Sequence, residues 1–306
     1  MLEAGETAGA RPRAGGFERG DVCVLFTAIC WGATYPVAKP LVAQLDPAFF
    51  SAVRYLTVAA LLFAWLAVTG RGAALARRDL LPLLGLGLLG FTIFQGVWGF
   101  ALERTTAAKG SILIATSPIF GALLASWRGE RLSLRGWAGV LLAFLGVAFV
   151  VAGGGRARLG DGALVGDLLF LLCAFTWALF TTTSAPVAAR LGPVLATAWS
   201  ALFGAALLLP FGLPATLAQD WSALPPSLAW NFLFVSVVSG AAAHLAYYAG
   251  IGRLGVARAM AYLYLTPVFA TVVAVLALGE SLAWAQVAGA LAVLAGVALA
   301  RTGVSR

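Results

Sequence analysis

Two long stretches of the chain repeat each other and decide the fold. Residues 107–151 read AAKGSILIATSPIFGALLASWRGERLSLRGWAGVLLAFLGVAFVV, and residues 256–300 read VARAMAYLYLTPVFATVVAVLALGESLAWAQVAGALAVLAGVALA. Each contains two apolar segments of helix length joined by a Gly-Glu pair, and Pro118 of the first matches Pro267 of the second. A match at a fixed spacing indicates that the chain contains two copies of one structural unit.

The overall composition is that of a membrane protein. The 306 residues are 61% hydrophobic and only 10% charged, and the mean hydropathy is +0.95. Soluble domains are roughly 45–50% apolar and about 25% charged, so an ordinary soluble enzyme and a disordered chain are both excluded. The 20 Lys and Arg residues are scattered between apolar segments rather than clustered, which excludes nucleic acid as the partner.

Ten apolar segments predict an all-α polytopic membrane protein with ten transmembrane helices, because a spanning helix needs about 20 apolar residues. The repeat divides them into two five-helix units, at 21–152 and 163–301. A Gly-rich linker at 153–162 joins the units, and tails at 1–20 and 302–306 flank them. The expected helices cover residues 21–43, 47–69, 80–101, 107–127, 134–152, 163–188, 194–212, 226–250, 256–278 and 283–300.

The positive charges predict the orientation. Fourteen Lys and Arg lie in the tails and at one set of helix ends, five lie at the other set, and Arg54 lies inside a helix. Positive charge marks the cytoplasmic side, so we expect both termini in the cytoplasm and the chain in the cell (inner) membrane. Since five is an odd number, the second unit enters the membrane upside down. Inverted repeats are typical of transporters, which bind substrate between the halves.

Several motifs resemble the drug/metabolite transporter superfamily and, within it, the EamA-type family. Besides the two repeated stretches, they are CWGATYPVAK at 30–39 and DPAFFSAVRYLTVAALL at 46–62. The resemblance implies two inverted five-helix halves around a central cavity, lined by the first, third, fourth, sixth, eighth and ninth helices. It also implies small metabolites such as amino acids as the substrates, usually exported.

Aromatic and polar side chains on those helices are the predicted substrate-binding residues. Aromatic rings hold amphipathic or cationic solutes by apolar contact and cation–π attraction, although each ring is also compatible with a place in the interfacial belt. Hydroxyl and amide groups can bond a solute or only another helix. The set is Trp31, Tyr35, Gln95, Trp98, Ser111, Trp177, Thr181, His244, Tyr247, Tyr248 and Tyr262.

Two ionisable residues inside helices have alternative interpretations. Arg54 is a charge partner for an anionic group such as a substrate carboxylate, or it snorkels or binds carbonyls of a neighbouring helix end. The second interpretation is favoured, because the resemblance places Arg54 on a helix away from the cavity centre. His244 either carries protons, which would then be a transport partner, or is a neutral residue hydrogen-bonded in the bundle. No Asp or Glu lies deep inside a helix, which argues against carboxylate-based proton exchange.

Pro118 and Pro267 interrupt the fourth and ninth helices at matching positions. Each removes a backbone hydrogen bond and kinks its helix. The pair is either a static packing feature or a symmetric pair of gating hinges. The repeat symmetry favours hinges, because alternating access exchanges two equivalent conformations.

These features predict a secondary transporter of amino acids or similar small amphipathic metabolites that works by alternating access, with export as the favoured direction. The alternative is a proton-independent facilitator or exchanger of cationic aromatic compounds, vitamins, phosphorylated solutes or nucleotide sugars. An intramembrane enzyme would need a Ser–His pair, two His or paired carboxylates, and the sequence offers no such set. The expected partners are a small molecule and the lipid bilayer, with no cofactor and no metal; the sequence specifies no oligomeric state.

Overall fold

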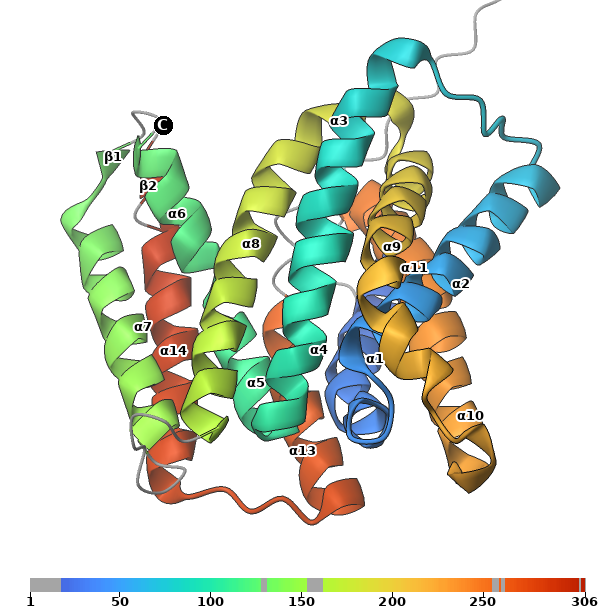
Figure 1. Cartoon of the computed structure of the whole chain (residues 1–306). Coiled ribbons are helices and arrows are strands. Elements are labelled where there is room, and N and C mark those ends of the chain that lie inside the picture. The colour runs from blue at the N-terminus through green and yellow to red at the C-terminus, as the bar shows by residue number, and fades with distance from the viewer. Residues whose placement is uncertain are drawn as a thin grey trace, which may run out of the picture.

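Helices make up almost all of the described chain (Figure 1). The computed structural model describes residues 18–127, 131–152, 162–254, 259, 262–302 and 304–305. The predicted N-terminal tail and Gly-rich linker lie almost wholly outside these residues, as does the Gly-Glu pair at 129–130 inside the first repeated stretch.

Two of the predicted helices in the first half of the chain depart from a regular α-helix. The helix from Arg77 to Arg104 widens into a π-helical segment at its centre, and a turn at Ala115 and Thr116 divides the fourth predicted helix. The elements are α1 (Arg19–Val42), α2 (Pro47–Val68), α3 (Arg77–Gly87), the π-helical η1 (Leu88–Ile93), α4 (Phe94–Arg104), α5 (Ala107–Ile114), α6 (Ser117–Trp127), β1 (Arg131–Leu132) and α7 (Leu134–Ala152).

The second half repeats this pattern, including a π-helical segment in the third of its long helices. A 3-10 turn lies within the ninth predicted helix of the chain, directly before its regular α-helical part. The elements are α8 (Gly162–Leu191), α9 (Pro193–Leu217), the 3-10 turn η2 (Trp221–Ala223), α10 (Ser227–Leu233), the π-helical η3 (Phe234–Ala242), α11 (Ala243–Leu254), the 3-10 turn η4 (Leu263–Leu265), α13 (Thr266–Leu278), α14 (Trp284–Thr302) and β2 (Val304–Ser305). The two-residue strands β1 and β2 pair in antiparallel fashion.

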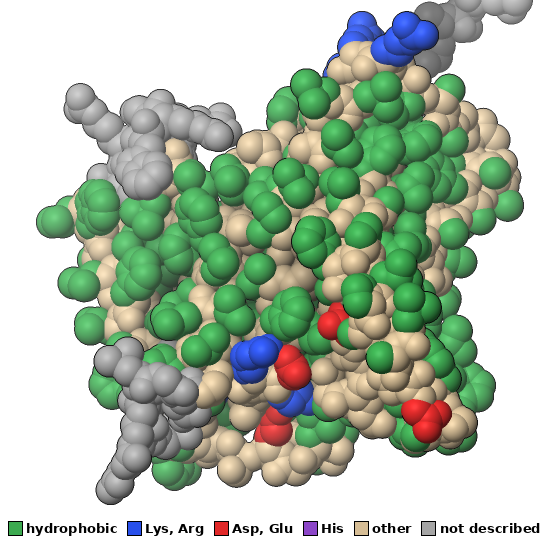
Figure 2. Space-filling model, in the orientation of Figure 1, with side chains coloured by type: hydrophobic (Ala, Val, Ile, Leu, Met, Phe, Trp, Pro, Cys, Tyr) green, Lys and Arg blue, Asp and Glu red, His purple; other side chains and the backbone are tan. Residues whose placement is uncertain are grey.

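The outer surface is suited to lipid. Seven helical segments of the described chain are long and apolar enough to cross a bilayer, and three shorter apolar helices accompany them, at Leu134–Val150, Leu263–Leu278 and Trp284–Leu299. Large apolar side chains project outward; Leu276 is 81% exposed and Phe211 is 75% exposed. Figure 2 shows hydrophobic side chains covering the middle of the visible face, with charged groups gathered toward its two ends. Such a surface is stable only where lipid covers it, so the chain is a multi-pass membrane protein.

The two halves exchange their first helices. α1 packs against α11 and α13 of the second half, and α8 packs against α4, α5 and α6 of the first half. The remaining helices pair with their repeat partners, α2 with α9 and α7 with α14. This reciprocal pattern is the one expected of two equivalent units related by a pseudo-two-fold axis.

Thr105 shows that the units are inverted. Its backbone oxygen accepts a hydrogen bond from Lys39 Nζ near the C-terminal end of α1, and its hydroxyl donates to Asp167 near the N-terminal end of α8. The C-terminal end of α1 and the N-terminal end of α8 therefore lie at the same end of the molecule. Because α1 and α8 are equivalent helices of the two repeats, the repeats run in opposite directions.

Glycines set the closest helix contacts. A Cβ atom added to Gly146 of α7 would lie 2.7 Å from the backbone oxygen of Gly289 of α14, and one added to Gly296 would lie 2.6 Å from that of Gly139. These are the glycines that the sequence spaces seven apart in each repeat. They allow the backbones of α7 and α14 to touch, which side chains would prevent.

Candidate functional site

A cavity of about 650 Å³ lies between the two halves. This is within the range of pockets that hold small ligands, and its wall is mostly aromatic and apolar. Every predicted substrate-binding residue except Tyr262 lines it, together with Arg54 and both prolines. The predicted residues on the wall are Trp31, Tyr35, Gln95, Trp98, Ser111, Trp177, Thr181, His244, Tyr247 and Tyr248.

Tyr262 lies elsewhere. Its hydroxyl donates to Asp21 Oδ1 near the N-terminus of α1, at 2.8 Å. The neighbouring Tyr264 lines the cavity instead. Side chains two residues apart on a helix face nearly opposite sides, so only one of these two tyrosines can line the cavity.

The cavity wall includes two helices that were not expected there. α2 contributes Arg54 and Tyr55, and its repeat partner α9 contributes Thr197 and Ser200. The placement of Arg54 away from the cavity is therefore wrong. Its neighbour Tyr55 gave no separate signal in the sequence, because an aromatic residue on a helix is equally compatible with lipid exposure.

Arg54 is buried, with only 5% of the residue exposed, and contacts on several sides hold its side chain in place. Its Nε donates to the backbone oxygen of Val235 at 3.1 Å. The guanidinium carbon lies 5.0 Å from the ring centroid of Tyr55 and 5.6 Å from that of Trp98, distances typical of cation–π contacts. The side chain thus binds a carbonyl, as one of the alternatives predicted, and it also borders the cavity rather than snorkelling to an interface.

The π-helical segment η3 supplies backbone acceptors to the cavity wall. Besides the bond to Arg54, the oxygen of Ser239 accepts a hydrogen bond from Trp31 Nε1 at 3.2 Å, and that of Gly240 accepts one from His244 Nδ1 at 2.5 Å. π-helical segments inside α-helices are frequent at functional sites, because they shift the register of the backbone groups. The sequence gives no direct sign of them beyond a glycine in each.

Ring contacts hold the aromatic residues of the wall in groups. Trp31 of α1 packs on His244 and Tyr247 of α11, each at 5.2 Å between ring centroids. Deeper in the wall, Tyr35 meets Trp98 edge-to-face at 5.6 Å. These contacts fix the rings in place, so that they present a preformed apolar surface to a bound molecule.

Several polar residues of the wall have local partners, whereas the buried hydroxyls of Ser200 and Thr266 have none among the described residues. Gln95 donates to the hydroxyl of Tyr55 at 2.8 Å, and Ser111 and Thr181 donate to oxygens of the preceding turns of their own helices. Their oxygens keep acceptor capacity for a ligand. Among the described residues, no group of three His, Cys, Asp or Glu is placed to bind a metal ion.

Both prolines lie where a span is broken rather than in the middle of a helix. Pro118 follows the turn at Ala115 and Thr116 as the second residue of α6, and Pro267 is the second residue of α13 after the 3-10 turn η4. A proline costs nothing in the first turn of a helix, because that N–H has no partner there. Each broken span therefore provides a joint beside the cavity.

The described cavity wall extends toward one end of the molecule. It reaches Ala188 and Pro193, at the connection between α8 and α9 beside Arg190. At the other end, Lys39 Nζ donates to the backbone oxygens of Leu102 and Thr105, and the Glu280 carboxylate accepts from the N–H groups of Ala107 and Ala108. These bonds join α1 and α13 to α4 and α5 and close that end.

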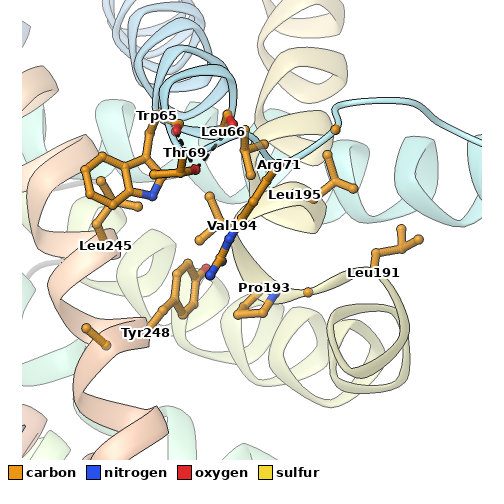
Figure 3. Close-up of a pocket in the computed structure, with 13 residues that line it drawn as sticks. Trp65, Leu66, Thr69, Arg71, Leu191, Pro193, Val194, Leu195, Leu245 and Tyr248 are labelled. Carbon is orange, nitrogen blue, oxygen red and sulfur yellow. Dashed lines mark hydrogen bonds between the residues drawn. The ribbon is translucent and has the colours of Figure 1, made fainter.

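A smaller pocket of about 400 Å³ adjoins the cavity at its open end and shares Pro193 and Tyr248 with it. It lies between the end of α2, the start of α9 and α11. Figure 3 shows the Arg71 side chain passing Val194 toward Tyr248.

Comparison with known proteins gives a consistent result. The model of the EamA-like transporter family matches residues 18–152 and again residues 164–302. An "Uncharacterized transporter" of Archaeoglobus fulgidus is 29% identical over 89% of this chain and 94% of its own length. A "Probable terminal-alkyne amino-acid exporter" of Streptantibioticus cattleyicolor is 30% identical over 84% of each chain.

One solved crystal structure has the same fold, with a TM-score of 0.64 and 21% identity over 91% of this chain and 95% of that chain. The double match of the family model covers both repeats. The two relatives are named as a transporter and an exporter, and the match spans 94% and 84% of their lengths. The chain therefore belongs to the EamA-like transporter family and is a transporter.

Proposed function

We propose that this protein exports amino acids or similar small amphipathic metabolites across the cell (inner) membrane. The observation that carries the proposal is the aromatic cavity between two inverted halves, which reaches the arginine-rich end of the molecule. The relative named as an amino-acid exporter supports this substrate class.

The proposed orientation places ten spans in the membrane as two repeats, residues 21–152 and 163–301, with both termini cytoplasmic. The seven long apolar segments and the three shorter apolar helices would together supply the ten spans. Arg71, Arg77, Arg78 and Arg190 lie at the end that the cavity reaches, and positive charge favours the cytoplasmic side. In this orientation the cavity is open to the cytoplasm, which is the loading state of an exporter.

Alternating access would exchange the open and closed ends. The bonds of Lys39 and Glu280 would break at the outer end while α6 and α8 approach α11 at the cytoplasmic end. Pro118 and Pro267 would act as the hinges, because each begins a half-helix after a break in its span. Because the repeats are inverted, each half would adopt in one conformation the arrangement that the other half has in the other conformation.

Counterflow in proteoliposomes tests the proposal. Vesicles loaded with one unlabelled amino acid should take up the labelled form, and Trp98→Ala should reduce this uptake because it removes a ring from the cavity wall. Trp230→Ala is the matched control, since Trp230 is 74% exposed on the outer surface. Equal uptake by wild type and Trp98→Ala, or no uptake across the amino acids, would contradict amino-acid transport through this cavity and direct the panel to vitamins, cationic aromatics and phosphorylated solutes.

A further inference from the structure

We infer that Arg54 binds the carboxylate of the transported molecule, so that the substrates are small amphipathic carboxylates and an α-amine is not required. This inference rests on the proposed function and narrows its substrate class.

The donors of Arg54 are only partly used. An arginine side chain has five N–H donors, and Nε gives its single one to Val235. The four N–H groups on the two Nη atoms have no acceptor among the described residues. Because Tyr55 and Trp98 lie against the guanidinium and Val235 holds Nε, the group cannot turn away freely. Fixed, parallel N–H groups are the geometry that a carboxylate binds in bidentate fashion.

The charge of Arg54 also lacks a counter-ion. The described cavity wall contains no Asp, Glu or Lys and no second Arg. The buried acid Asp167, at the closed end, is already engaged by Lys109 at 2.5 Å and by the hydroxyl of Thr105. A buried cation without a partner is strongly unfavourable, and an anion bound at Arg54 would remove that cost.

The rest of the wall determines which anion fits. One cation suits a monoanion such as a carboxylate, whereas a phosphate dianion needs several. Trp31, Tyr35 and Trp177 offer apolar contact to the body of the molecule. No described acid faces the cavity to pair with an ammonium group, so an amine gains only cation–π contact with the rings. We therefore expect the carboxylate to dominate recognition.

Binding of matched triads to the purified full-length protein tests this directly. Each triad contains an amino acid, its amide and the acid without the amine: leucine, leucinamide and 4-methylpentanoate; phenylalanine, phenylalaninamide and 3-phenylpropanoate. Tryptophan fluorescence is the readout, because Trp98 lies against Arg54. We expect the two carboxylates of a triad to bind within about threefold of each other, and the amide to bind about 10- to 100-fold more weakly.

Variants connect this preference to Arg54. Arg54→Gln should remove the difference between acid and amide, whereas Arg54→Lys should keep part of it through its charge. Arg104→Gln is the matched control, since Arg104 is exposed and pairs with the adjacent Glu103. The melting temperature without ligand shows whether each variant folds, and Arg54→Lys carries the test if the glutamine variant does not.

The inference is overturned if the amide binds as well as the acid, if Arg54→Gln retains the preference, or if neither triad binds. Counterflow separates this outcome from the proposed function. Transport of amino acids with equal use of their amides would retain the transporter and remove the role of Arg54. Carboxylate binding at Arg54 without counterflow would retain the subsite and contradict the transport of these substrates.

Discussion

Glu280 Oε1 accepts a hydrogen bond of 2.8 Å from the backbone nitrogen of Ala107, and this contact joins the end of α13 to the start of α5. Glu280 Oε2 binds the next N–H, that of Ala108, at 3.1 Å. The first N–H groups of a helix have no partner within it and carry partial positive charge. A carboxylate at this position is therefore a favourable but breakable link between the two halves.

Replacing Glu280 by Gln should loosen the closed end. Glutamine keeps one acceptor oxygen but loses the charge, which is worth about 0.3–1 kcal/mol near a helix N-terminus. We expect a thiol reagent added from the outer side to label Ser111→Cys about two- to fivefold faster when Glu280→Gln is present, in a protein whose three native cysteines are replaced by alanine.

Glu103→Gln is the control for this prediction, because Glu103 forms its side-chain ion pair with the adjacent Arg104 at the same end. It should leave the labelling rate unchanged. Equal rates for Glu280→Gln and Glu103→Gln would show that Glu280 does not hold the outer end closed.

The buried pair of Lys109 and Asp167 should be strongly coupled. Both side chains are less than 10% exposed, and their charged atoms lie 2.5 Å apart. Lys109→Met leaves the carboxylate buried without its cation, which costs about 3–5 kcal/mol. The melting temperature of the purified protein should fall clearly, and the double variant Lys109→Met/Asp167→Leu should recover most of the loss. A double variant as unstable as the single one would contradict the coupling.

The contact between α7 and α14 should not tolerate a side chain. In Gly289→Ala, the new Cβ would lie 2.6 Å from the oxygen of Gly146, so the helices must separate. We expect a loss of about 1–3 kcal/mol, seen as a lower melting temperature. Gly85→Ala is the matched control, because Gly85 has open space around its Cβ position and alanine is the better helix former. Equal melting temperatures for the two variants would contradict the predicted packing.

His244 should not couple transport to protons. Its Nδ1 binds the oxygen of Gly240, its ring packs on Trp31, and the described cavity wall contains no acid to exchange a proton with it. His244→Gln should keep the same dependence of flux on pH as wild type in vesicles with an imposed pH gradient. Loss of that pH dependence in His244→Gln would show that His244 couples transport to protons.

The helical content and the double repeat could be predicted from the sequence because each depends on strong, local signals. Apolar length marks the spans, and local capping chemistry marks some of their starts: Asp46 and Ser133 directly precede helices and accept hydrogen bonds from the backbone nitrogens of Phe49 and Gly136. The glycines spaced seven apart in α7 and α14 are visible in the sequence, but the helix that lies opposite each pair is not.

The cavity was predictable in part. Most of its lining follows from aromatic and polar residues at helical spacing, but two features depend on geometry that this spacing does not encode. The rotation of this span about its own axis places Tyr262 at Asp21 and leaves Tyr264 on the cavity wall. Arg54 reaches the cavity because α2 packs beside η3, whose carbonyl at Val235 fixes the side chain.

Blocking the cavity with a covalent group tests most directly whether it is the transport route. Thr181→Cys, in a protein whose native cysteines are replaced by alanine, places a thiol on the wall toward the open end. Ala74→Cys places one on an exposed loop at the same end. A charged, membrane-impermeant thiol reagent added from the cytoplasmic side should abolish counterflow in Thr181→Cys, with protection by excess substrate, and leave Ala74→Cys active. Full counterflow after complete labelling of Thr181→Cys would show that substrates do not pass through this cavity.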